Sequence, residues 1–123
     1  MKVLDLVLKR QWYDMIERDE KPEEYRDITP HYFSLLVRTG ETMSRRIESC
    51  ENLQNPHSAA RWNFENGYYN RRDYDAVRFH RAYTNTTMMR EYRGLYIGRG
   101  NPDWGAPTDR DVFILALGRR IEQ

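Results

Sequence analysis

The hydrophobic positions of the chain change period several times, and each change marks a predicted element. Residues 3–8 place leucines on one face and valines, Val7 among them, on the other. A strand that is apolar on both faces indicates a central position in a sheet or barrel. The period then becomes helical, because Trp12, Met15 and Ile16 recur at spacings of three and four among charged residues, which predicts a short amphipathic helix.

Proline residues delimit the next two predicted elements. Pro22 is excluded from a helix interior and favours an extended chain, so residues 24–26 are predicted to form a short strand. Thr29 and Pro30 combine a hydroxyl cap with a proline at the first helical position, which predicts the start of a second helix. We expect this helix to end near residues 39–40, where glycine offers a stop.

Regular patterns return in the C-terminal half. Residues 75–83 alternate and residues 88–97 follow as a second strand, before a loop at 98–107 that is rich in glycine and proline. Residues 112–117 are apolar on both faces, and Gly118 is expected to end that strand. The chain therefore predicts an α+β fold, a small mixed β-barrel of about five strands with two or three short helices.

Length and pattern together predict one domain with one insertion. A chain of 123 residues fits a single domain at 1–123. Residues 42–73 carry no clear period and are expected to form an irregular insertion. Tyr68, Tyr69, Arg71 and Arg72 in this insertion could stack on bases and hold phosphates, or could belong to a solvated loop.

Composition and charge narrow the classes of function. The formal net charge is only +1, so no global field draws the protein to nucleic acid or membrane. Nearly all of the basic residues are arginine, which pairs bidentately with phosphates and carboxylates and stacks on bases. The single cysteine, Cys50, excludes an internal disulfide, and neither a signal peptide nor a membrane-length apolar run is present. We expect a cytoplasmic protein without membrane association.

The usual signatures of catalysis and cofactor binding are absent. The three histidines and the cysteine lie far apart in sequence without metal-ligand spacing, so we expect no metal. The glycines at 98, 100 and 105 do not make a dinucleotide fingerprint, and no phosphate-binding loop or serine nucleophile elbow occurs. We therefore expect no cofactor.

The remaining candidate is the polar segment at residues 21–26. In an extended chain Glu24 and Arg26 share one face, where the carboxylate can accept from an amino group and the guanidinium can engage a carbonyl or a phosphate. Lys21 could add a point charge or, if buried, act as a base. The alternative interpretation is an exposed ion pair on an edge strand.

This segment and its surroundings resemble the ASCH domain, a family of the PUA-like superfamily, in the small stand-alone form found in bacteria and phages. The N-terminal likeness rests on a strand that ends in Lys9, on a helix with an aromatic-Asp-x-Ile core, and on the segment Lys-Pro-Glu-Glu-Tyr-Arg at 21–26. The C-terminal likeness covers residues 74–83, 94–105 and 113–118. Only the insertion lies outside the resemblance.

The resemblance implies a PUA-like β-barrel with a cleft beside residues 21–26 that holds RNA or a nucleotide-like ligand. Carried over by position, it assigns ligand binding to Lys21, Glu24 and Arg26, with Lys9 nearby at the strand end. Trp104 in the C-terminal loop either plugs one end of the barrel or offers a face for stacking.

Two departures from the family pattern shape the functional expectation. Asp19 stands where relatives carry glycine, so the turn before Lys21 could differ in shape. Some members resemble amidohydrolases of modified cytidine and carry threonine where this chain has Glu24, which removes the hydroxyl from this position. We therefore expect a module that binds RNA or a modified nucleoside without turnover. The alternative is a hydrolase of such ligands with Lys21 as base and Glu24 as acid, and a third possibility is protein interaction through the arginine-rich insertion.

Overall fold

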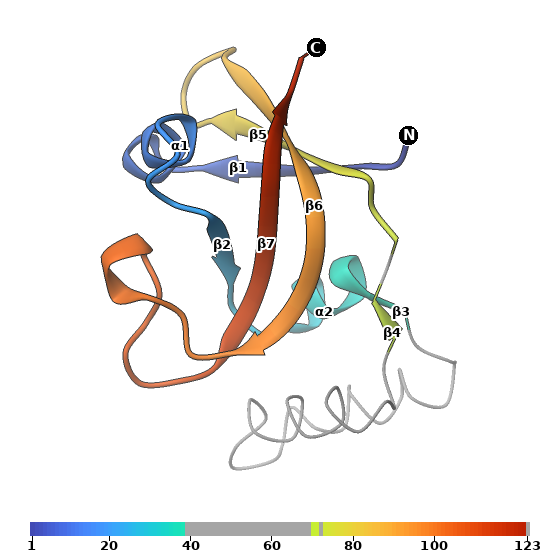
Figure 1. The fold of residues 1–123 in the computed structure, drawn as a ribbon. Coiled ribbons are helices and arrows are strands. Elements are labelled where there is room, and N and C mark those ends of the chain that lie inside the picture. Colours follow the sequence, from blue (N-terminus) through green and yellow to red (C-terminus); the bar gives the residue numbers. More distant parts are fainter. Residues whose placement is uncertain (39–69, 72, 123) are drawn as a thin grey trace. The chain divides into compact units, whose positions relative to one another are not determined.

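The computed structural model describes residues 1–38, 70–71 and 73–122, which contain a mixed five-stranded sheet, a separate pair of short strands and two α-helices (Figure 1). The strand order in the larger sheet is β1-β5-β6-β7-β2. This confirms an α+β fold with a small mixed sheet. Neither described α-helix combines the length and the apolar character that crossing a membrane requires. Most of the predicted insertion, including Tyr68, Tyr69 and Arg72, lies outside the described residues.

Contacts within the chain divide it into two compact units that interleave in sequence. The first unit contains residues 1–24, 73–94 and 115–123, and the second contains residues 25–72 and 95–114. Strands β2, β6 and β7 contribute residues to both units. The single domain expected for the chain stays a prediction.

In the first unit β1 (Val3–Leu8) pairs in parallel with β5 (Ala76–Arg81), which pairs antiparallel with the start of β6 (Thr87–Gly98). Helix α1 (Arg10–Glu17) confirms the predicted amphipathic helix, and it buries Tyr13 and Ile16 at a spacing of three. The core of this unit consists of large apolar side chains, among them Leu4, Leu6, Leu8, Val77, Phe79 and Met88.

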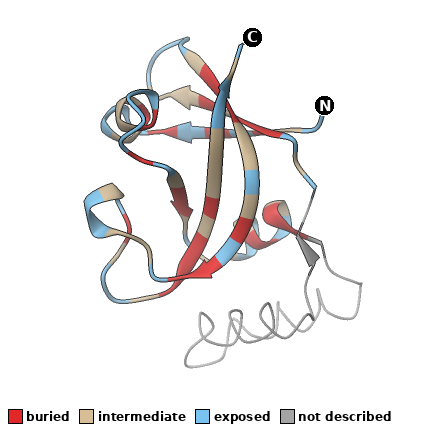
Figure 2. Ribbon diagram, in the orientation of Figure 1, coloured by how far each residue is buried: buried red, intermediate tan, exposed pale blue. Residues whose placement is uncertain are grey.

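The predicted central position of β1 is wrong. The strand lies at the edge of the sheet, and its side chains alternate between buried leucines and outward-facing residues (Figure 2). Val7 is 62% exposed, so the second apolar face does not meet a core. Valine favours extended backbone because of its branched Cβ, and this preference holds on a solvent-facing side of a strand as well. The valines therefore indicate that this segment is a strand, and they do not indicate that both of its faces are buried.

The second unit begins within β2 (Glu23–Arg26), which confirms the predicted short strand. Helix α2 (Pro30–Leu36) follows, and the Thr29 hydroxyl accepts a hydrogen bond from the Tyr32 backbone N–H at 3.2 Å, as the cap prediction requires. The helix ends at Leu36, earlier than predicted, because the chain turns into β3 (Val37–Arg38) and pairs with β4 (Asn70–Arg71).

The second unit also holds the short 3-10 helix η1 (Pro102–Trp104) and the first part of β7 (Val112–Ile121). Gly118 was expected to end this strand, but β7 continues past it, so that prediction is wrong. A Cβ at Gly118 would collide with the Arg93 and Glu91 side chains, both in the first unit. The glycine therefore permits a close approach of side chains to the strand instead of ending it.

Candidate functional site

Lys21 and Glu24 form a buried ion pair in the first unit. After α1 the chain folds back, and the backbone N–H groups of Glu20 and Lys21 both donate to the Met15 carbonyl. The Lys21 Nζ then lies 3.2 Å from a Glu24 carboxylate oxygen and 5.7 Å from the centre of the Trp12 ring. Only 2% of Lys21 and 5% of Glu24 is exposed. The alternative of an exposed pair therefore does not describe these two residues.

Burial makes this pair energetically unusual. Removing two charges from water costs several kcal/mol per ion, and their mutual attraction repays the cost only when the geometry is good (about 3 Å here). Apolar side chains of similar volume would often stabilise a protein equally well. Fold stability alone therefore does not explain why charged residues occupy these positions.

Asp19 occupies the turn that precedes this pair. Its φ angle is 60°, in the left-handed region that glycine adopts without strain and that aspartate tolerates better than most residues. The turn expected to differ in shape thus keeps a conformation that suits glycine, with aspartate adopting it. What changes is the side chain, since the Asp19 carboxylate reaches Arg90 Nη1 at 2.8 Å.

Arg90 on β6 is the functional candidate that sequence reasoning missed. It is only 6% exposed, and its Nη2 donates to the Ile16 carbonyl at 2.6 Å, while Nη1 also approaches the Gly118 carbonyl at 3.5 Å. Its sequence context gives only a weak signal, because two methionines, Met88 and Met89, precede it and the charged Glu91 follows it. Such a mixed pattern does not distinguish a buried guanidinium from one that reaches solvent.

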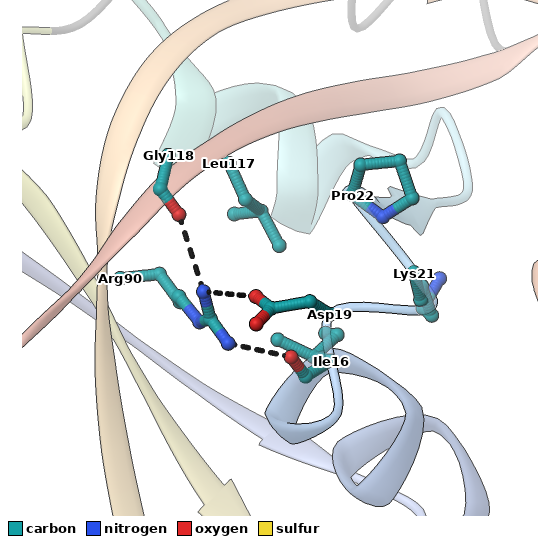
Figure 3. A pocket seen from close by; sticks show the side chains of 7 residues that line it. All are labelled: Ile16, Asp19, Lys21, Pro22, Arg90, Leu117 and Gly118. Carbon is teal, nitrogen blue, oxygen red and sulfur yellow. Dashed lines mark hydrogen bonds and ion pairs between the residues drawn. The ribbon is translucent and has the colours of Figure 1, made fainter.

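These residues surround a pocket of about 140 Å³. Figure 3 shows Arg90 and Gly118 on one side of it and Lys21 and Pro22 on the other, with Asp19 between them. The lining consists of Ile16, Asp19, Lys21, Pro22, Arg90, Leu117 and Gly118. A cavity of roughly 150 Å³ holds one benzene ring, whereas sites for drug-sized ligands span about 300–1,000 Å³. The pocket therefore has room for a single ring and not for a complete nucleotide.

Among the residues that the resemblance assigns, Glu24 lies outside this lining as the partner of Lys21, and Lys9 and Arg26 lie outside it as well. Lys9 is exposed at the end of β1, before α1 begins, and the pocket lies beyond the other end of that helix. Arg26 belongs to the second unit, where its Nη1 donates to the Tyr32 hydroxyl at 2.9 Å and its guanidinium lies 5.4 Å from the Tyr32 ring centre. Glu24 and Arg26 thus have different partners, although they share a strand.

Trp104 is half-buried in the second unit, at the end of η1. It packs against a small apolar cluster formed by Tyr25, Ala106 and Val112. The Tyr25 hydroxyl accepts a hydrogen bond from the Asn101 N–H at 3.0 Å, which ties the loop to this cluster. These contacts give Trp104 a packing role within its own unit.

Among described residues most pKa shifts belong to exposed ion pairs, whereas burial raises the pKa of the Tyr13 hydroxyl. A hydrogen bond from His80 lowers the pKa of Asp5, burial opposes this effect, and the Arg78 guanidinium lowers the pKa further. The Arg81 guanidinium likewise lowers the pKa of Asp14. These shifts follow from surface pairing and do not identify a catalytic centre. Within residues 1–38, 70–71 and 73–122 no cluster of three or more potential metal ligands occurs.

Comparison with protein-family models, with curated proteins and with solved structures finds no match to this chain. The resemblance to the ASCH domain therefore stays a prediction. The geometry offers a ring-sized pocket that combines an apolar wall, from Ile16, Pro22 and Leu117, with Lys21 and the Asp19–Arg90 ion pair.

Proposed function

We propose that the protein binds a nucleobase, in RNA or in a modified nucleoside, in the pocket beside Lys21. The observation that carries the proposal is a ring-sized pocket lined by two buried cationic side chains, Lys21 and Arg90, each paired with a carboxylate. Pockets of this kind combine apolar walls with a few placed polar groups that orient the ligand.

The lining suits the two faces and the polar edge of a base. Leu117, Pro22 and Ile16 supply apolar contacts for a ring. Asp19 uses one carboxylate oxygen for Arg90, which leaves the other able to accept from an N–H or an amino group of a base. Carboxylates on proteins commonly accept from the amino group of cytosine.

The resemblance to the ASCH domain supplies the wider setting of this proposal. It suggests that the mixed sheet closes into a PUA-like barrel, that the ligand belongs to an RNA or a nucleoside, and that the protein works in the cytoplasm. The assignment of Arg26 and Trp104 to ligand binding rests on this resemblance alone.

A binding panel tests the proposal. NMR and calorimetry measure binding of three kinds of ligand: the four common nucleosides, N4-acetylcytidine and short single-stranded RNAs. Each ligand is titrated into the wild type and into two variants. Leu117→Trp fills the pocket, and Ile121→Trp is a control on the same strand outside the lining. Binding is expected for the wild type and the control and is expected to be lost in Leu117→Trp, while melting curves verify folding. If the wild type binds no member, or Leu117→Trp binds equally well, the proposal is wrong. Arg26→Ala in the same panel tests the residue that the resemblance adds.

One observation favours hydrolysis as a second candidate. Lys21 and Glu24 lie 3.2 Å apart, within range for proton exchange, and Lys21 lines the pocket. Incubation with acylated nucleosides and with RNA, followed by mass spectrometry, separates binding from turnover. Product that disappears in both Lys21→Met and Leu117→Trp would establish the hydrolase, and unchanged substrate would exclude hydrolysis of those compounds.

A further inference from the structure

Both cations that line the pocket already have a carboxylate partner. Lys21 pairs with Glu24 at 3.2 Å, and Arg90 pairs with Asp19 at 2.8 Å, so the four groups sum to a formal charge of zero. The Arg90 guanidinium also donates to the Ile16 carbonyl, which further occupies its donors. An incoming anion would therefore find no uncompensated positive charge in this lining.

The two pairs differ in how their carboxylates are held. Glu24 is buried with Lys21, whereas the Asp19 side chain is 78% exposed while the Arg90 side chain is only 8% exposed. An exposed carboxylate on a buried guanidinium can move into water at little cost, whereas the guanidinium stays in place through its backbone acceptors. Asp19 is therefore the adjustable member of the lining.

The backbone conformation at position 19 also indicates that the Asp19 side chain has a role in the pocket. A φ of 60° is strained for residues with a Cβ, and glycine would adopt it freely. Aspartate at this strained position places a carboxylate in the pocket lining, within hydrogen-bonding distance of Arg90. The turn itself does not require this side chain.

We infer that Asp19 determines the charge class of the ligand, so that the pocket accepts uncharged rings and rejects rings or groups that carry a negative charge. This inference rests on the proposed function and deepens it. An anion beside Arg90 would lie close to the Asp19 carboxylate, which would repel it. An uncharged base meets no such repulsion.

The test compares ring-sized ligands that differ in charge. Uracil and cytosine are the uncharged rings, orotate is uracil with an added carboxylate, and inorganic phosphate is the anion without a ring. Affinities are measured by calorimetry and NMR for the wild type, for Asp19→Gly, which suits the observed φ, and for Asp19→Asn. Glu20→Gln is the matched control, because it removes one negative charge at the next residue and does not line the pocket.

The wild type is expected to bind an uncharged ring at least about tenfold more tightly than orotate, because the orotate carboxylate would lie near the like-charged Asp19. Asp19→Gly and Asp19→Asn should erase or reverse this preference, and phosphate binding should appear in them and weaken with added salt. Glu20→Gln should behave as the wild type does.

The outcomes separate this inference from the proposed function. If the wild type binds a base and the two Asp19 variants bind orotate and phosphate no better than Glu20→Gln does, the inference is overturned and the proposed function stands. If phosphate binding appears in the Asp19 variants but no form of the protein binds a base, the role of Asp19 is supported and the proposed function fails. If none of the four proteins binds any of these ligands, both are wrong.

Discussion

The two units use the same kinds of charged side chain in different ways. In the first unit Lys21 and Arg90 are buried and line a pocket, and each pairs with a carboxylate, Glu24 and Asp19 respectively. In the second unit Arg110 pairs with Asp27 at 3.0 Å and Arg99 with Asp111 at 3.3 Å, and both arginine side chains remain accessible to water. Water and salt screen such accessible pairs, whereas buried charges depend on their partners. Burial, rather than the presence of charge, therefore distinguishes the candidate site.

The largest effect is expected from breaking the buried pair of the first unit. Lys21→Ala removes the cation that pairs with the buried Glu24 carboxylate, which should lower the free energy of unfolding by about 3–5 kcal/mol. Urea denaturation measures this change, with Arg110→Ala as the exposed counterpart, whose midpoint should barely move. Equal shifts in the two variants would remove the proposed contrast between the units.

A double variant sharpens that result. Lys21→Met combined with Glu24→Leu replaces the pair by apolar side chains, so that neither of the two positions carries a buried charge. Most of the stability lost in Lys21→Ala should return in this double variant, and urea denaturation measures the recovery. A double variant as unstable as the single one would show that the pair itself holds the turn in place.

A smaller loss is expected from Arg90→Ala. The Ile16 carbonyl loses a guanidinium donor at 2.6 Å in a buried setting, and a hydrogen bond to a charged group contributes about 1.5–3 kcal/mol. Arg99→Ala is the matched change in the second unit, because Arg99 donates to the Thr108 carbonyl at 2.7 Å in an exposed setting. Chemical denaturation of both variants checks the difference, and a larger loss in Arg99→Ala would contradict it.

In the second unit the sensitive feature is packing. A Cβ at Gly100 would lie 2.6 Å from both the Ala106 Cβ and the Tyr25 ring, so Gly100→Ala should cost about 1–3 kcal/mol through overpacking. Gly98→Ala is the control, since its Cβ would meet only Ile114 at an ordinary 3.8 Å. Thermal unfolding should place Gly98→Ala near the wild type, and equal losses would show that the loop is not tightly packed.

The smallest effect is expected from an exposed pair of the first unit, and it depends on pH. The hydrogen bond from His80, followed by the Arg78 guanidinium, lowers the pKa of Asp5 below its usual 3.8 in the folded state. The stabilisation is therefore present above pH 3.8 and is lost as the pH falls through the folded-state pKa. Asp5→Asn should be slightly less stable than the wild type at pH 6, and the difference should shrink below pH 3.8, as urea midpoints at several pH values will report. A gap that widens in acid would contradict this assignment.

Local features were the most predictable from the sequence. The Thr29 cap, the helical spacing of α1 and the extended segment after Pro22 were all predicted, and the structure confirms them. Each of these features depends on residues within a few positions of one another, so a short stretch of sequence is enough to predict it. Gly118 was misjudged because its neighbours Glu91 and Arg93 come from a distant part of the chain.

The sequence by itself determined the local elements and the α+β class, because periodicity, caps and proline act locally. Only the tertiary structure decided that Lys21 and Glu24 are buried, that Arg26 donates to the Tyr32 hydroxyl, and that Arg90 lines the same pocket as Lys21. The Arg90–Asp19 contact joins residues 71 positions apart. Burial of a charge is a property of such distant partners, since each partner must offset the loss of water, and no local pattern records it.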